Sequence, residues 1–163
     1  MTLFKETQRF NQWWFWLIVI AINGLNLVFV VNQLLYFTFT VPISDTGVIF
    51  TAIFTLLLTI FLINIKLETQ INEDGIYVRF FPLQVKLRHF AWDTINKCYV
   101  RKYSPLKEYG GWGIRYNLIG KGKAYNIAGN MGLQIEFKNG DKFLIGTGKS
   151  KNLELILKKF IGN

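Results

Sequence analysis

Two long uncharged segments constrain this chain more than any other feature. Residues 10–44 contain no charged side chain, and after Asp45 residues 46–65 contain none either. A water-soluble domain does not leave 61 of its first 65 positions uncharged. Only residues 66–163 remain for a soluble core, which is enough for one small domain and too little for an α/β enzyme of ordinary size.

Each uncharged segment is long enough to cross a bilayer. We expect spans at about residues 13–31 and 48–65; the first measures about 28 Å as a helix, close to the hydrocarbon thickness. A buried helical hairpin in a soluble bundle is the alternative, but the rest of the chain offers no amphipathic partner helices. The sequence therefore predicts a two-span membrane anchor over residues 1–65 and a soluble domain over residues 66–163.

The basic residues near the spans predict the orientation. Lys5 and Arg9 precede the first span, Lys66 and Arg79 follow the second, and residues 32–47 contain neither lysine nor arginine. Because cytoplasmic flanks carry the excess of Lys and Arg, we expect both termini in the cytoplasm and the spans in the inner membrane. The formal net charge of +9 falls entirely on the soluble part.

Polar residues inside the spans are spaced for helix packing. Thr51, Thr55 and Thr59 recur every four residues and form one stripe, while Asn23 and Asn26 supply amides on the first span. Asn23 and Thr55 lie at a similar depth, about 15 Å from the cytoplasmic ends, so we expect them to pair. Contact between copies of the chain is an alternative; an ion path would normally need ionisable residues at that depth.

The soluble part has the pattern of a small β domain. Residues 67–146 form short alternating segments separated by turn residues, including Asn72–Gly75 and the hairpin pair Asn139-Gly140. This pattern predicts seven strands in a sandwich or barrel. Apolar residues then recur at helical spacing, at Leu153, Ile156, Leu157 and Phe160. We expect this C-terminal amphipathic helix to close one end of the barrel.

Several residue runs resemble a known domain. They are Trp92-Asp93 with Ile95, the run Gly110–Arg115, Ala124-Tyr125, Asn139-Gly140, and Ile145–Thr147 before the last helix. In this order they resemble the bacterial pleckstrin-homology-like (PH-like) domains found after two membrane spans. The resemblance implies a seven-stranded PH-like barrel with a C-terminal helix, and it implies no settled activity.

Residues 146–150, GTGKS, imitate the end of a phosphate-binding loop. The first glycine that such a loop requires is replaced by Phe143, so we expect no nucleotide site. Thr147 or Ser150 is expected to cap the following helix. A weak anion contact at the helix start remains open, because free N–H groups and two lysines would face it.

No catalytic or metal-binding group stands out. His89 and Cys98 are the only residues of their kinds, so they cannot form a metal site by themselves. The carboxylates are scattered, mostly at turns, and the basic residues form no clustered run of the kind that binds nucleic acid. We therefore expect no enzymatic activity, no cofactor, no metal and no nucleic-acid partner.

The basic residues of one predicted hairpin are more informative. If Pro82-Leu83 forms a two-residue turn, Arg79 lies opposite Lys86 and Tyr77 opposite Arg88, which places three cations and a ring on one face. Such a face is either solvated or compensated by an anionic partner, and the anionic inner leaflet is a candidate.

Two functions follow from these observations. The first is a non-enzymatic, membrane-anchored interaction module that binds a protein partner or anionic lipid headgroups at the cytoplasmic face. The alternative is an accessory subunit of a transport or envelope-maintenance complex that acts through its spans. Exchange of the spans for unrelated ones would separate the two.

Overall fold

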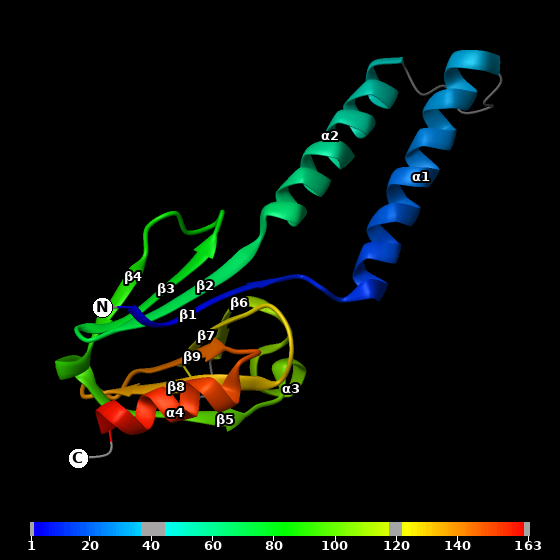
Figure 1. Cartoon of the computed structure of the whole chain (residues 1–163). Coiled ribbons are helices and arrows are strands. Elements are labelled where there is room, and N and C mark those ends of the chain that lie inside the picture. Colours follow the sequence, from blue (N-terminus) through cyan, green and yellow to red (C-terminus); the bar gives the residue numbers. More distant parts are fainter. Residues whose placement is uncertain (1, 37–44, 118–121, 162–163) are drawn as a thin grey trace. The chain divides into compact units, whose positions relative to one another are not determined.

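The chain divides into two compact units. The computed structural model describes residues 2–36, 45–117 and 122–161. A helical unit comprises Asn11–Asn64, and a β unit comprises Met1–Phe10 together with Ile65–Asn163. The chain therefore belongs to the β unit both before and after the helices (Figure 1). The predicted boundary, which assigned all of residues 1–65 to the anchor, differs from the structure in this respect.

The helical unit contains the two apolar segments. Helix α1 covers Trp13–Tyr36 and helix α2 covers Asp45–Asn64. Both are long and apolar enough to cross a membrane, and only 6% of the most apolar window of each is buried. A core helix of a soluble bundle is mostly buried, so this exposure argues against the bundle alternative. The expected spans coincide with these helices to within a few residues.

The β unit contains two sheets. Sheet A has the order β1-β2-β3-β4 and sheet B the order β5-β8-β9-β7-β6. All neighbouring strands are antiparallel except β7 and β9, which are parallel. The strands are β1 Thr2–Arg9, β2 Lys66–Asn72, β3 Gly75–Phe81, β4 Arg88–Ala91, β5 Ile95–Lys102, β6 Gly113–Asn117, β7 Gly122–Asn126, β8 Met131–Phe137 and β9 Lys142–Gly146. The short helices are the 3-10 turn η1 Trp92–Thr94 and α3 Pro105–Tyr109.

The two sheets pack face to face instead of forming the predicted seven-stranded barrel. Aromatic contacts join them: the ring centroids of Phe90 and Phe143 lie 5.0 Å apart, and those of Phe80 and Tyr125 lie 6.0 Å apart. Within the described residues the strands do not close into a barrel. The alternating pattern located strands but could not specify their partners, since strands far apart in sequence, such as β5 and β8, are neighbours.

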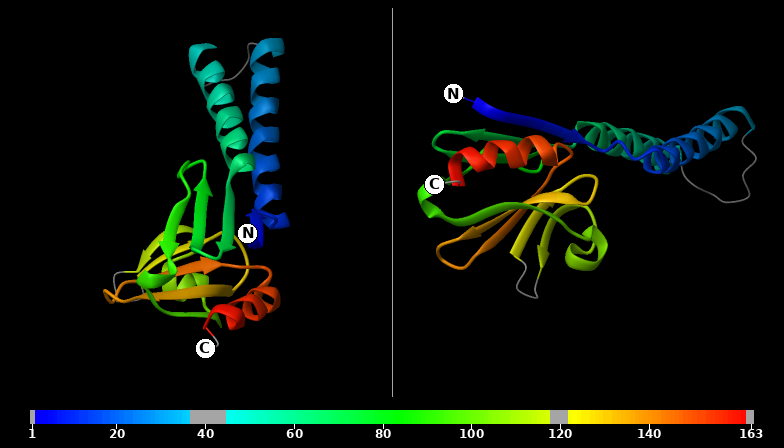
Figure 2. Two further views of the ribbon diagram at one scale, coloured as in Figure 1. Left: turned by 60° about the vertical axis from the view of Figure 1, so that its left-hand side comes forward. Right: turned by 60° about the horizontal axis from the view of Figure 1, so that its bottom comes forward.

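The C-terminal helix is present but does not plug an end. Helix α4 covers Ser150–Ile161 and packs against β5, β1 and β8. Its Leu153 and Leu157 are buried, as expected from their helical spacing, whereas the side chain of Phe160 lies outside the described residues. Figure 2 shows α4 lying along the side of the two sheets, between β1 and β5.

Strand β1 was missed because its inward positions are mostly polar. Phe4, Glu6 and Gln8 alternate toward the interior, and Phe4 and Glu6 are each 5% exposed. Only Phe4 is apolar, so no period-two hydrophobic pattern marks the strand. Gln8 instead donates a hydrogen bond through Nε2 to the carbonyl oxygen of Gly146, 2.6 Å away. The residues before α1 thus tie sheet A to the end of β9.

Candidate functional site

The predicted basic hairpin face does not assemble. Tyr77 pairs with His89 and Val78 with Arg88, one residue out of the expected register, because the β3–β4 connection spans residues 82–87 and not two residues. A shift of one residue moves a strand's side chains to the opposite face. Arg88 therefore lies on the interior side, with its guanidinium carbon 5.2 Å from the ring centroid of Phe90.

Arg79 keeps its outward position but is already paired. It lies opposite Glu68 on β2, and its Nε donates to Oε2 of Glu68 at 2.8 Å. Lys66 Nζ also contacts Glu68, at 2.7 Å from Oε1. Burial is the largest single influence on Glu68 and opposes its ionisation, but the hydrogen bonds and positive charges of Lys66 and Arg79 together outweigh it and lower the pKa of this carboxyl. Glu68 therefore compensates part of the charge on this face.

Tyr77 forms a small cluster at the other end of its strand. Its hydroxyl donates to Oδ2 of Asp74 at 2.5 Å, and its ring stacks on His89 with centroids 4.3 Å apart. The hydrogen bond from Tyr77 lowers the pKa of Asp74, and the same bond raises the pKa of Tyr77. Asp74, Tyr77 and His89 thus contact one another around the β2–β3 turn. This cluster stabilises the turn and presents no free cation.

One end of sheet A carries a different group of cations, and both connections to the helices leave from it. Arg9, Lys66 and Phe81 lie side by side on adjacent strands at this end, which we call the connection end. Helix α2 ends at Asn64 and α1 begins at Trp13, so each connection is at most three residues long.

The chemistry of the connection end is basic. Arg9 is exposed and directly opposite Lys66, and like charges in this arrangement destabilise a sheet. Lys66 Nζ also lies 5.3 Å from the ring centroid of Phe81. Among the described residues Arg9 forms no ion pair. In the sequence, Arg9 and Lys66 indicated only the orientation of the spans, because the pairing of β1 with β2, which brings them together, was not predicted.

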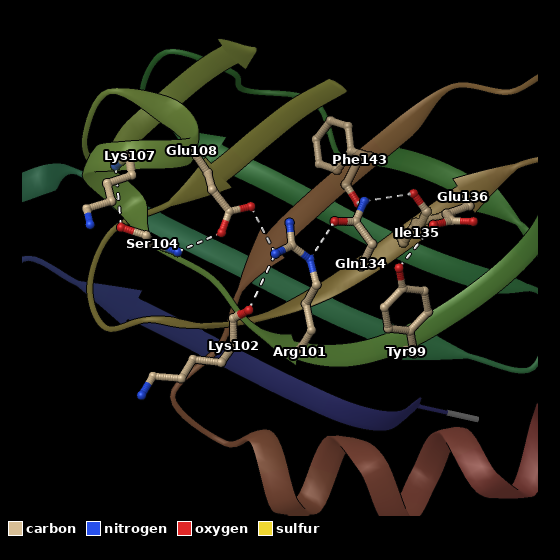
Figure 3. Close-up of polar contacts among 10 residues, drawn as sticks. All are labelled: Tyr99, Arg101, Lys102, Ser104, Lys107, Glu108, Gln134, Ile135, Glu136 and Phe143. Atoms are coloured by element: carbon tan, nitrogen blue, oxygen red, sulfur yellow. Dashed lines mark hydrogen bonds and ion pairs between the residues drawn. The ribbon is translucent and has the colours of Figure 1, made fainter. Parts of the chain in front are cut away.

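A polar network lies on the outer face of sheet B (Figure 3). Arg101 is its centre: Nε donates to Oε1 of Gln134 and Nη1 to Oε2 of Glu108, both at 3.0 Å. Glu108 also accepts a hydrogen bond from the Ser104 backbone N–H at the start of α3, at 2.9 Å. Nearby, the Tyr99 hydroxyl donates to Glu136 at 3.0 Å.

The hollow beside this network measures about 210 Å³ and is electrically balanced. Its lining contains two cations, Arg101 and Lys142, and two carboxylates, Glu108 and Glu136. Because Arg101 and both carboxylates already bond within the chain, the hollow offers no uncompensated charge that would select an ionic ligand. Burial, together with the hydrogen bond to Glu136, raises the pKa of Tyr99, so this phenol is not a base at neutral pH. We interpret the network as structural.

The loop that imitates a phosphate site holds a carboxylate of the chain itself. Glu6 Oε1 accepts the Gly148 N–H at 2.8 Å, and Oε2 accepts the Thr147 hydroxyl at 2.6 Å. The Thr147 hydroxyl oxygen in turn accepts the Lys149 N–H at 3.1 Å. The anion contact left open at this helix start is thus filled by Glu6, which explains why a buried carboxylate is tolerated on β1.

The remaining candidate groups lie apart. His89 belongs to sheet A and Cys98 to sheet B. Burial raises the pKa of the Cys98 thiol to about 12, so this residue is not a nucleophile at neutral pH. Over the described ranges, no group of three or more His, Cys, Asp or Glu side chains could hold a metal ion.

The polar stripe of the helical unit joins α1 to α2. Asn23 Nδ2 donates to Oγ1 of Thr59 at 3.0 Å and to the Val19 carbonyl at 2.8 Å. The partner of Asn23 is thus one turn away from the expected Thr55, because the helices are offset relative to a count from their ends. Thr55 and Thr51 donate only to carbonyls of their own helix. Asn26 is half-buried, on the same side of α1 as Asn23.

Comparison with known proteins identifies no relative of this chain. No protein-family model matches the chain, and no curated protein or solved structure matches it either. The resemblance to PH-like domains therefore rests on the residue runs alone and stays a prediction.

Proposed function

We propose that the chain is a two-span integral membrane protein whose β unit lies at the cytoplasmic face of the inner membrane and engages anionic lipid headgroups without catalysis. The observation that carries this proposal is the connection end. Both links to the apolar helices leave sheet A beside Arg9 and Lys66. Chain connectivity alone keeps these two cations near the level at which the helices enter the bilayer.

The charge balance favours an anionic surface. Arg9, Lys66 and Arg79 lie at or next to this sheet end, and Lys86 lies in the connection that leaves it. Over the described residues, Glu68 is the only carboxylate paired with them. A basic residue close to an anionic leaflet contributes about 1 kcal/mol of attraction. Headgroups between Arg9 and Lys66 would also relieve the repulsion between these opposed cations.

The alternative, an accessory subunit acting through its spans, receives less support. The amide N–H groups of Asn23 are bonded within the helical pair, to Thr59 and Val19. A buried amide that required a partner subunit would leave these donors unsatisfied in the isolated chain. The span exchange described above still separates the two functions, since retained function favours the anchored module.

The test is the preference of the full-length protein for anionic lipid. In reconstituted bilayers, electron spin resonance of spin-labelled lipids measures how strongly each headgroup associates with the protein. We expect phosphatidylglycerol to associate more strongly than phosphatidylcholine, and this preference to fall with salt because screening shortens to about 8 Å at physiological ionic strength.

A charge-matched pair of variants makes the test specific. The double variant Arg9→Gln and Lys86→Gln should lose most of the preference. The double variant Lys151→Gln and Lys158→Gln, which removes two exposed cations of α4, should keep it. Equal association of both lipids with the parent protein would contradict the proposal and would favour a protein partner for the β unit.

A further inference from the structure

The β3–β4 connection, residues 82–87, displays apolar side chains to solvent within the β unit. Leu83, Val85 and Leu87 are 61%, 65% and 41% exposed, respectively, and they alternate with Gln84 and Lys86. Single exposed apolar residues are ordinary. Three within six residues form a concentrated apolar surface, because removal of each of these side chains from water is favourable.

The chain holds this segment in a defined shape. The Gln84 N–H donates to the Phe80 carbonyl at 2.7 Å, and Arg79 Nη1 donates to the Val85 carbonyl at 3.2 Å. Arg79 is itself fixed by Glu68. The apolar side chains are thus presented by hydrogen bonds that reach back into sheet A.

The position of the segment indicates what covers it. It follows Phe81 and therefore leaves sheet A at the connection end, beside Arg9 and Lys66. Within the β unit it projects away from sheet B (Figure 1 and the left view of Figure 2). Lys66 follows α2 by two residues, a reach of about 7 Å, so a membrane that holds the helices also lies next to this sheet end.

We propose that residues 82–87 form a third membrane contact, in which Leu83, Val85 and Leu87 insert into the boundary between headgroups and acyl chains. Apolar side chains flanked by cations are the composition of interfacial membrane contacts. Arg79 and Lys86 supply the flanking cations at the headgroup level. This inference rests on the proposed membrane location, but it needs no preference for anionic lipid, because burial of apolar surface drives it.

The test uses a fluorescent label on the full-length protein. Cys98 is buried, with a pKa of about 12, so a thiol-reactive label should react with an introduced cysteine and leave Cys98 unmodified. Val85→Cys carries the label at the centre of the segment, and Leu83→Cys provides a second position. The protein is reconstituted into phosphatidylcholine bilayers with or without bromine atoms near the headgroup end of the acyl chains.

We expect the brominated lipid to quench most of the emission at Val85 and Leu83. A label at Glu73→Cys is the matched control: it lies in the turn at the opposite end of β3, about 20 Å further along the strand, and should not be quenched. Quenching at Val85 no stronger than at Glu73 would overturn the inference and would leave this surface for a protein partner.

The outcome separates this inference from the proposed headgroup binding. Quenching in pure phosphatidylcholine, combined with no preference for phosphatidylglycerol, would support the insertion and contradict the headgroup proposal. A label on Ile63→Cys, near the end of α2 and 51% exposed, lies at the depth of the bromine atoms and reports the spans themselves. If that label also escapes quenching, the membrane location fails, and the insertion fails with it.

Discussion

Strand β1, which precedes α1, carries one buried carboxylate, Glu6, that bonds to the residues just before α4. We therefore expect Glu6→Ala to destabilise the β unit. Glu6 is 5% exposed and accepts two hydrogen bonds, from Thr147 and Gly148. Hydrogen bonds to a charged group contribute about 1.5–3 kcal/mol each. Because water can enter the vacated space and recover part of this loss, we expect the free energy of unfolding of the β unit to fall by about 3 kcal/mol.

The assay is thermal unfolding of the full-length protein in detergent, followed by near-ultraviolet circular dichroism. For a domain of this size, 3 kcal/mol corresponds to a decrease in the midpoint on the order of 10 °C. Glu6→Gln keeps one acceptor and should fall between Glu6→Ala and the parent. Lys5→Ala, at the exposed neighbouring position, is the matched control and should change little. Equal midpoints for Glu6→Ala and Lys5→Ala would refute the role assigned to Glu6.

Three further predictions follow from individual contacts. The pKa of Glu68 is lowered in the folded state, so its contribution to stability is present above its ordinary pKa of 4.5 and is lost as the pH falls below that pKa. Glu68→Gln should therefore make the free energy of unfolding depend less on pH in this acidic range. An unchanged pH dependence would contradict the pairing of Glu68 with Arg79 and Lys66. Thr59→Val removes the acceptor of Asn23 and should destabilise the helical unit in detergent by about 0.6 kcal/mol, whereas Thr55→Val should have a smaller effect. A larger effect of Thr55→Val would support the pairing of Asn23 with Thr55 that the sequence predicts. A fragment that begins at Lys66 lacks β1, exposes the edge of β2 and should self-associate. The comparison is a chain in which residues 2–9 are joined to Lys66 through a two-residue Asn-Gly turn, because Arg9 lies directly opposite Lys66. A monomeric fragment of parent-like stability would show that β1 is dispensable.

The features that depend on local pattern could be predicted from sequence. The uncharged runs located α1 and α2, and the Asn139-Gly140 pair lies in the β8–β9 turn, where Gly140 has a φ of 88°. The helical spacing of Leu153 and Leu157 likewise located α4. Each of these signals lies within one segment of chain, so no knowledge of its neighbours was needed.

The features that depend on pairing could not be predicted. Strands β7 and β9 are parallel neighbours in the sheet although β8 lies between them in the sequence, and no residue pattern predicts this pairing. The register of β3 and β4 required the true length of their connection, and a difference of one residue moved Arg88 to the interior side. The role of Glu6 could not be predicted for a third reason. A polar residue is normally expected at the surface, and only its partners, Thr147 and Gly148, explain why Glu6 is buried.

The most general proposal for this protein is the location of its β unit at the cytoplasmic face of the membrane. It is tested most directly by two reporters fused after Asn163 in a bacterial host, one active only in the cytoplasm and one active only in the periplasm, with membrane fractionation of both fusions. Because Lys and Arg flank the two helices on one side only, we predict a membrane-bound product in which only the cytoplasmic reporter is active. Activity of the periplasmic reporter would contradict the cytoplasmic location of the β unit, and a product found in the soluble fraction would contradict the membrane spans.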